Sequence, residues 1–450
     1  MSQRTKMLSQ IAGFRGWKVV ETRWENAAGQ PIEPIAGYYV PADAVLVLVM
    51  GRRWAPRCPK CLAICSRSCH ENCDTRRWAD LPWAGHQVKL EYAAIRVICP
   101  RCEQHAVEML GWADPKQRQT RRLQQTLALD AFSMPLVHVA TKYGLDWHTV
   151  RRAEQSAIER WENTREKTPL TKVGVDEKWL GRKHKREEKF VTIVSDLDTG
   201  LPIWIGYGRS AATLTSFLQT LTPDQKAAIE LFAADMHAPF RKAIQDDPEL
   251  EHAVIVHDPF HIMKRAGEAL SELRRATFFR AGPELRAVGR GTSWLVLKAW
   301  EKTSDEEKAT LRQLFSYNTK LARAYQVVDE LRVVLRAPDD TAMAKGMWHV
   351  LCRTTRRDNV PMRKLHDSLA AHMLGILALG AHRPPVGRIE ALNNNWETLV
   401  RRARGYRNHL YLLAKLRFIT ANPVANEKGI RRFLALGLTP PNTVTVADAA

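Results

Sequence analysis

Two short apolar segments of this chain each end at an aspartate, and this feature restricts the possible folds more than any other. Val173–Val175 precedes Asp176, and Leu231–Ala234 precedes Asp235. Apolar runs this short are typical of buried strands, because helices need longer periodic segments. An acidic side chain at the end of a buried strand lies at the edge of a sheet, where it can meet a ligand.

The pattern around these aspartates predicts an order of strands. From Lys172 the apolar spacing changes from helical to strand-like, and a hairpin turn is expected at 197–200. The expected strands are 173–176, 190–195, 202–207, 229–233 and 253–257, with a helix near 212–221 after the third. Three antiparallel strands followed by alternating helices and strands is the order of the ribonuclease H-like α/β fold. The first and fourth strands are neighbours there, so Asp176 and Asp235 could share a metal ion.

A third carboxylate, Glu390, lies in the polar helical segment Arg-Ile-Glu-Ala-Leu-Asn-Asn-Asn at 388–395. Three carboxylates provide hard oxygen ligands, which suit Mg²⁺ or Mn²⁺ held against a phosphodiester. Asn394 lies one turn after Glu390 on the same helical face and could support the site. Glu177 should point to the opposite face of its strand and is not expected to be a ligand. For each aspartate alone, capping of the next turn remains an alternative.

The charge of the chain favours a polyanionic partner. Its 450 residues include 68 Lys and Arg against 48 Asp and Glu, for a formal charge of +20. Neutralising phosphates releases counterions and gives affinity for nucleic acid, although ribosomal and membrane-surface proteins share such a charge. No signal peptide opens the chain and no apolar stretch approaches the roughly 20 residues needed to span a bilayer. We therefore expect a soluble, cytoplasmic protein with no membrane contact.

Seven of the eight cysteines lie between positions 58 and 102. Cys58-Pro-Lys-Cys61 and Cys99-Pro-Arg-Cys102 form two knuckles of the kind that closes a tetrahedral Zn²⁺ site. The alternative, a pair of disulfides, does not suit a cytosolic chain. The residues between the knuckles could bind a second zinc, exchange with the outer set or be reduced thiols in a loop; they are Cys65, Cys69, His70 and Cys73. A packed thiol is expected at Cys352.

Residues 118–161 show the spacing of a helix-turn-helix domain. Apolar residues recur helically over Arg118–Phe132, and Pro135 can open a second helix. Gly144 suits the left-handed position that ends a helix, and Asp146 can cap a third helix running to Trp161. That third helix would enter the major groove, although glycine turns between helices are also common in all-α proteins. Its candidate DNA contacts are His148, Thr149, Arg151 and Arg152.

A basic run follows the helix that carries Glu390. With Tyr406 interleaved, it could follow a DNA backbone, or it could be a solvated charged face. Its arginines are Arg401, Arg402, Arg404 and Arg407.

Taken together, these motifs resemble bacterial insertion-sequence transposases of the ISL-three group, part of the DDE superfamily. The resemblance runs from the cysteine knuckles to about Arg417. Its motifs include Val-Gly-Val-Asp-Glu, Ala-Ala-Asp-Met-His-Ala-Pro-Phe, Val-His-Asp-Pro-Phe-His-Ile-Met-Lys and Arg-Ile-Glu-Ala-Leu-Asn-Asn-Asn. It implies that Asp176, Asp235 and Glu390 are the DDE triad and that the front domains recognise terminal repeats. It also implies a helical insertion between the second and third carboxylates.

The segment Asp258-Pro-Phe-His261 matches a D-x-x-H motif found where helical insertions begin in several transposase groups. His261 could contact a phosphate or an extruded base, and Asp258 could orient it. The alternative is a helix start, with Asp258 as the cap, Pro259 at the first position and His261 packed.

The expected function is that of a DNA transposase. Two Mg²⁺ or Mn²⁺ ions at the triad would support cleavage at the terminal inverted repeats and strand transfer into target DNA. Because two ends are cut together, a homodimer or larger assembly is expected on DNA. The rivals are a DNA-binding regulator on a domesticated transposase frame and a metal-dependent nuclease without strand transfer.

The expected domains follow the chain in order. They are an N-terminal region with the zinc module at 1–115, the helix-turn-helix domain at 116–168, a first catalytic part at 169–263, an all-helical insertion at 264–383, a last catalytic part at 384–420 and a C-terminal tail at 421–450.

Overall fold

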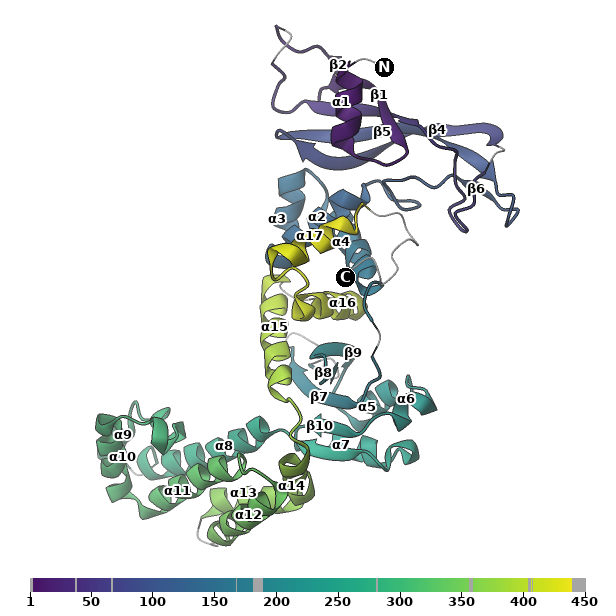
Figure 1. Cartoon of the computed structure of the whole chain (residues 1–450). Helices are drawn as coiled ribbons and strands as arrows, with labels where there is room; N and C mark the ends of the chain where they lie inside the picture. The colour runs from purple at the N-terminus through teal and green to yellow at the C-terminus, as the bar shows by residue number, and fades with distance from the viewer. Residues whose placement is uncertain are drawn as a thin grey trace. The chain divides into compact units, whose positions relative to one another are not determined.

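The computed structural model describes residues 3–36, 39–65, 68–166, 168–180, 189–280, 282–355, 359–403, 406 and 408–438, without the side chains of residues 68–73 and 403. The chain divides into two compact units, whose elements are labelled in Figure 1. The first unit comprises Met1–Lys167 with Thr398–Ala450, and the second comprises Thr168–Glu397. Within the described ranges, no helix has both the length and the apolar character needed to cross a membrane.

A six-stranded sheet forms the N-terminal part of the first unit. Its strands are β1 (Trp17–Glu25), β2 (Pro31–Ile32), β3 (Val45–Arg52), β4 (Ser68–Trp83), β5 (His86–Ile98) and β6 (His105–Val107). They run in the order β2-β1-β3-β5-β4, with β6 also on β5. Alternation along β5 buries Val88, Leu90 and Tyr92 in a core that includes Trp17 and Trp112. Helix α1 (Gln3–Ala12) adds Leu8 and Ala12 to that core.

The remaining elements of the first unit are helices, including α2 (Arg121–Ser133), α3 (Leu136–Tyr143) and α4 (Trp147–Glu162). Two further helices, α16 (His409–Ala421) and α17 (Glu427–Ala435), pack on them through Phe418 and Phe433. The side-chain amide of Gln125 donates to the carbonyl of Phe433 (2.7 Å). The expected tail from 421 is therefore wrong for this stretch, because the apolar face of α17 is buried against α2 and α16.

The second unit contains a five-stranded sheet. Its strands are β7 (Lys172–Trp179), β8 (Phe190–Asp196), β9 (Leu201–Tyr207), β10 (Leu231–Ala234) and β11 (Val254–His257). Their order is β11-β10-β7-β8-β9. β7, β8 and β9 pair antiparallel, whereas β10 pairs in parallel with both β7 and β11. The expected strands and the adjacency of the first and fourth are confirmed, although β7 continues three residues beyond Asp176.

Helices complete the second unit. α5 (Ala211–Leu218), α6 (Pro223–Ala227) and α7 (Ala238–Gln245) follow β9 and β10, and α5 and α7 share a core with the sheet through Phe217, Phe232 and Phe240. Between β11 and α15 (Gly387–Ala403), the described residues form helices and turns without a strand. The helices are α8 (Pro259–Phe278), α9 (Pro283–Gly289), α10 (Asp305–Tyr317), α11 (Thr319–Val334), α12 (Asp340–Thr354), α13 (Val360–Ala371) and α14 (Met373–His382) (Figure 1). Their apolar core continues to Met236 and to Val256 of β11.

Candidate active site and zinc centre

Asp176 and Asp235 lie side by side on neighbouring strands. In the parallel pairing of β7 with β10, Ala234 is opposite Val175, so the next residue on each strand is an aspartate. Asp176 is buried within β7, where β8 pairs along its other edge, and it does not cap a turn. Asp235 follows the end of β10, and its Oδ1 accepts a hydrogen bond from the N–H of Met236 (2.5 Å). Asp176 makes the same kind of contact with the N–H of Glu177 (2.8 Å), and the N-cap of the helix after Asp235 is His237, so neither aspartate is the cap of a described helix.

His261, in the first turn of α8, lies between these two carboxylates. Its Nε2 is 3.7 Å from Asp176 Oδ1, and its Nδ1 is 3.4 Å from Asp235 Oδ2. Asp258 is the N-cap of α8 and accepts a hydrogen bond from the N–H of Phe260 (2.8 Å), with Pro259 at the first helical position. The helix-start interpretation of this motif is confirmed, and that helix start also brings His261 to the aspartates.

The charges at this position depend on one another. Burial disfavours the ionised form of Asp176, but the hydrogen bond from His261, the charge of Lys178 and the hydrogen bond from Asn393 lower its pKa. Burial likewise disfavours protonation of His261, but Asp176 and Asp235 raise its pKa. For Asp258, burial prevails and raises the pKa. The space between Asp176 and Asp235 therefore favours a positive charge.

Helix α15 brings Glu390 to a cavity beside these residues. The cavity has a volume of about 330 Å³, and its walls include Lys178, Asp258, His261, Glu390 and Asn393. Asn393 Nδ2 donates to Asp176 Oδ2 (2.7 Å), and Lys178 Nζ is 3.8 Å from the same oxygen. A strand residue, a helix start and a second helix thus meet at one cavity.

The three carboxylates suit a hard divalent cation, but they are not closed around one. Among the described residues, only a set of four cysteines brings three or more ligand atoms of His, Cys, Asp or Glu within 4.8 Å of one another. Asp176 and Asp235 contact the same imidazole, whereas Glu390 reaches the cavity from α15. The aspartates could accept a cation where His261 now lies, and Glu390 would have to approach them.

Asn393, which the sequence pattern did not single out, donates to Asp176. Asn394 also lines the cavity, and helical periodicity alone could not choose between consecutive asparagines. Lys178 was missed, although its position two residues after Asp176 places it on the same face of β7. Glu177 lies on the other face and pairs with Arg209 (3.2 Å), as predicted.

The four knuckle cysteines form a compact sulfur cluster in the first unit. Sγ of Cys58 is 3.7 Å from that of Cys102, and Sγ of Cys61 is 3.3 Å from Cys99 and 3.9 Å from Cys102. A tetrahedral site with Zn–S bonds of about 2.3 Å requires sulfurs roughly 3.8 Å apart. None of the described cysteines forms a disulfide. The cluster therefore fits one zinc ion, with all four sulfurs as ligands.

The surrounding backbone prepares these sulfurs for a cation. Burial opposes ionisation of Cys99, but N–H groups of Cys102 and Arg101 lower its pKa to about 6. The N–H of Gln104 favours ionisation of Cys102, but the neighbouring thiols and burial raise its pKa to about 12. An ionised thiol thus disfavours ionisation of the neighbouring thiol, and a divalent cation would relieve the repulsion between the two negative charges.

Cys65 packs beside Cys58 and Cys99 but is not one of the four sulfurs of the possible metal site. Cys65 is buried, and its thiol lies 3.5 Å from the carbonyl of Ala63. The side chains of Cys69, His70 and Cys73 lie outside the described residues. Cys352 is exposed, so the expectation of a packed thiol is wrong; it lies on the outer face of α12.

Helices α2, α3 and α4 form the predicted helix-turn-helix. Gly144 ends α3 in the left-handed conformation (φ 62°), and the Asp146 carboxylate accepts hydrogen bonds from the N–H groups of His148 and Thr149. His148 and Arg152 are exposed, whereas Thr149 is 9% exposed and its hydroxyl also donates to Asp146. The structure thus assigns Thr149 to the cap. The guanidinium of Arg151 lies between Trp147 and Tyr411, with its carbon 5.9 Å and 5.7 Å from their rings.

The basic run beyond Glu390 has mixed surroundings. Arg401 is exposed, but Arg402 donates to the carbonyl of Phe132 (2.6 Å) and thereby fixes the end of α2. Arg404 and Arg407 lie outside the described residues.

Comparison with known proteins identifies the family. A family model described as a transposase matches residues 173–416, more than half of the chain, and includes Asp176, Asp235 and Glu390. A second, described as the helix-turn-helix domain of transposase family ISL3, matches residues 108–157.

Two similar proteins are transposases of named insertion sequences. The transposase for insertion sequence element IS1001 of Bordetella parapertussis is 27% identical over 417 residues, which cover 92% of this chain and 97% of that protein. The transposase for insertion sequence element IS1557 of Mycobacterium tuberculosis (strain ATCC 25618 / H37Rv) is 26% identical over 375 residues, 75% of this chain and 80% of that protein. With both its catalytic and its helix-turn-helix regions matched, the chain belongs to the ISL3 family of DDE insertion-sequence transposases.

Proposed function

We propose that this transposase cuts DNA at the terminal inverted repeats of its insertion sequence and joins the ends to target DNA, with Asp176, Asp235 and Glu390 as its DDE triad. One observation carries the proposal. Two aspartates from adjacent parallel strands contact one imidazole, and Glu390 lines the cavity to which that imidazole belongs.

The strand order supports a ribonuclease H-like catalytic domain in two parts, 169–263 and 384–420. The helices from α8 to α14 would then be the insertion, at 264–383, between the second and third carboxylates. Most buried apolar side chains of these helices pack against one another, which supports this division, and the same core continues to Met236 and to Val256 of β11.

Asp176, Asp235 and Glu390 would hold two Mg²⁺ or Mn²⁺ ions, which supply an activated water or 3′-hydroxyl and stabilise the leaving oxygen. Asn393 keeps Asp176 oriented by donating to its Oδ2. His261 would leave the space between the aspartates and donate a hydrogen bond to a phosphate oxygen, with Asp258 close by to orient it (4.0 Å).

The DNA contacts are divided between two surfaces. Exposed His148 and Arg152 on α4 would contact base edges, and Arg151 would contact the adjacent DNA backbone. Arg401, Arg404 and Arg407 would contact phosphates along the DNA.

A homodimer or larger assembly on nucleoid DNA is proposed because two element ends are processed together.

Cleavage of a labelled terminal-repeat duplex in Mg²⁺ tests this function. Asp235→Asn keeps the size of the side chain but removes a metal-binding charge, so nicking at the repeat boundary should fall by at least about a thousandfold. Glu177→Gln is the matched control, because this neighbouring acid lies on the other face of β7 and should leave nicking near the wild-type rate.

Nicking that survives Asp235→Asn would refute the assigned triad. Tight binding to the repeat without any nicking by the wild-type protein would favour a DNA-binding regulator, and nicking without joined products would favour a nuclease.

A further inference from the structure

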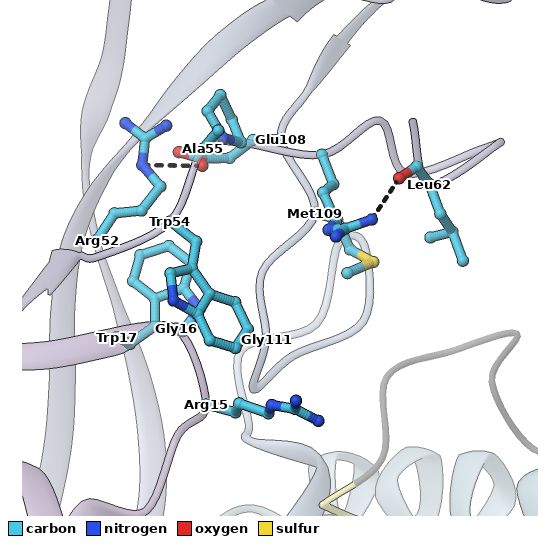
Figure 2. A pocket seen from close by; sticks show the side chains of 12 residues that line it. Arg15, Gly16, Trp17, Arg52, Trp54, Ala55, Leu62, Glu108, Met109 and Gly111 are labelled. Carbon is cyan, nitrogen blue, oxygen red and sulfur yellow. Dashed lines mark hydrogen bonds and ion pairs between the residues drawn. The ribbon is translucent and has the colours of Figure 1, made fainter. Parts of the chain in front are cut away.

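A second cavity, of about 350 Å³, lies in the first unit, and none of the residues that line it belongs to the proposed triad or to helices α2–α4 (Figure 2). Its walls come from the start of β1, the end of β3, the Cys58 knuckle and the segment after β6. They bring together three arginines and a tryptophan, with a carboxylate behind them: Arg15, Arg52, Arg57, Trp54 and Glu108. Neither the triad nor the zinc site accounts for this combination.

Trp54 provides a flat surface held by the backbone beneath it. The indole is 54% exposed, which is unusual for the largest apolar side chain. A Cβ on Gly16 (φ +84°) would lie 2.7 Å from its Cε3, so the ring packs directly on a residue that has to be glycine. The N–H of Arg53 donates to the carbonyl of Gly16 (2.8 Å) and fixes this approach. The guanidinium carbon of Arg15 lies 5.5 Å from the ring centroid.

Arg52 is oriented by a buried carboxylate. The Glu108 side chain is 0% exposed, and its Oε1 accepts hydrogen bonds from the hydroxyl of Tyr92 (2.8 Å) and the N–H of Ile95 (3.1 Å). Its Oε2 has no hydrogen-bond partner among the described residues and lies 3.6 Å from Arg52 Nε (Figure 2). Because a buried charge needs a counter-charge, Glu108 fixes Arg52 from behind. The ion pair uses Nε, and Arg52 lines the cavity.

An exposed aromatic ring beside an oriented guanidinium and further arginines is the chemistry that binds an unstacked nucleotide. Nucleobases stack on tryptophan, and arginines near the ring meet the flanking phosphates. The planar fork of an arginine matches two adjacent acceptors, which guanine presents as O6 and N7. Adenine places an amino donor beside N7, and thymine offers a methyl group beside its acceptor, so both fit this fork poorly.

We propose that this cavity binds one unstacked guanine nucleotide of the DNA substrate. The base stacks on Trp54, Arg52 donates to guanine O6 and N7, and Arg15 and Arg57 lie next to the flanking phosphates. The inference rests on the proposed DNA function and adds a base-reading site outside the helix-turn-helix. It also gives the zinc centre a role, because Arg57 directly precedes Cys58 and hydrogen-bonds the knuckle at Leu62 (3.0 Å).

Binding of the zinc-loaded full-length protein to labelled single-stranded oligomers tests the proposal. The oligomers are an oligothymidylate and the same strand with one central guanine, adenine or cytosine, at moderate salt so that phosphate contacts do not dominate. The guanine strand should bind about tenfold more tightly than oligothymidylate. Arg52→Lys keeps the charge but loses the fork, so it should abolish this preference and leave oligothymidylate binding within about twofold.

Trp54→Ala should weaken binding of every strand by about tenfold, whereas Trp54→Phe should retain most of it. Trp83→Ala and Arg96→Gln are the matched controls, since Trp83 is an exposed tryptophan (43%) and Arg96 an exposed arginine, both outside the cavity. Equal affinity for all four strands, or a guanine preference that persists in Arg52→Lys, would overturn the proposal.

Binding to the terminal-repeat duplex is measured in parallel, so that failure of the proposed guanine site can be distinguished from failure of the proposed transposase function. Duplex binding and nicking without any guanine preference would remove this site and leave the transposase function intact. Failure to bind either kind of DNA would refute both.

Discussion

Both carboxylate oxygens of Asp176 are held by named partners. Oδ1 accepts from the N–H of Glu177 (2.8 Å) and lies 3.7 Å from His261, and Oδ2 accepts from Asn393 (2.7 Å). Such a buried carboxylate is oriented by its neighbours before any cation arrives. Orientation of this kind matters for catalysis, because a small misplacement of a reacting group slows the chemical step.

At the scale of single residues, an experiment can show which of Asn393 and Asn394 supports Asp176. Asn393→Ala removes a hydrogen bond to a charged group, worth about 1.5–3 kcal/mol, so the single-turnover nicking rate should fall by about tenfold or more. Asn394→Ala is the matched control and should have the smaller effect. The opposite order would mean that Asn394 supports the site, as the sequence pattern indicated.

At the scale of elements, the strands and helices follow local signals. Helix α3 ends at Gly144 and α4 begins after Asp146, as predicted, because a left-handed glycine and a capping carboxylate act on the adjacent backbone. In contrast, four charged side chains link strands that are far apart in sequence. Arg23 of β1 forms ion pairs with Glu25 of the same strand and with Glu91 of β5, and Arg77 of β4 forms ion pairs with the same two glutamates.

This charged group makes the stability of the N-terminal sheet depend on pH. Burial opposes ionisation of Glu25 and Glu91, but Arg23 and Arg77 lower the pKa of both. Their stabilisation is therefore complete above the unfolded value of about 4.3 and is lost as pH falls through the lower folded pKa. The melting temperature should drop as the pH falls below about 5, and Glu25→Gln should reduce that drop.

Glu21, an exposed glutamate of β1, provides the control for this pH dependence. Glu21→Gln should leave the pH dependence of the melting temperature unchanged. An equal loss of pH dependence in both variants would show that general charge, rather than the contacts with Arg23 and Arg77, controls the stability of this sheet.

At the scale of the whole molecule, the polypeptide leaves its first unit at residue 167 and returns to it at Thr398. Helix α15 spans this return: Glu390 belongs to the second unit, and Arg401 and Arg402 belong to the first. Glu390, the proposed third carboxylate, and Arg402, which donates to the carbonyl of Phe132, therefore lie on the same helix.

Substitution of a knuckle cysteine tests the proposed zinc site in the first unit. The purified protein should contain about one zinc per chain, and Cys58→Ser should lower that content several-fold and reduce thermal stability, because four sulfurs hold the knuckles together. Cys352→Ser is the matched control, since Cys352 is exposed on a helix of the other unit. Atomic absorption and a melting curve give both readouts, and unchanged zinc in Cys58→Ser would refute the four-cysteine site.

The sequence by itself determined the strands of the second sheet, the helix-turn-helix and the family of this protein. Strand periodicity, capping residues and the two cysteine knuckles act over a few residues, so they can be recognised without coordinates. The pairing of Asp176 with Asp235 also followed, because the strand order places them on neighbouring strands. The match to ISL3 transposases agrees with the motifs that carried the resemblance.

Only the tertiary structure decided which side chains meet. It places His261 between two aspartates, brings Asn393 to Asp176 and packs α17 where a tail was expected. It also brings Glu108 behind Arg52 and Trp54 onto Gly16. These contacts join residues from separate elements, and their geometry depends on how whole surfaces pack, which no local pattern in a sequence encodes.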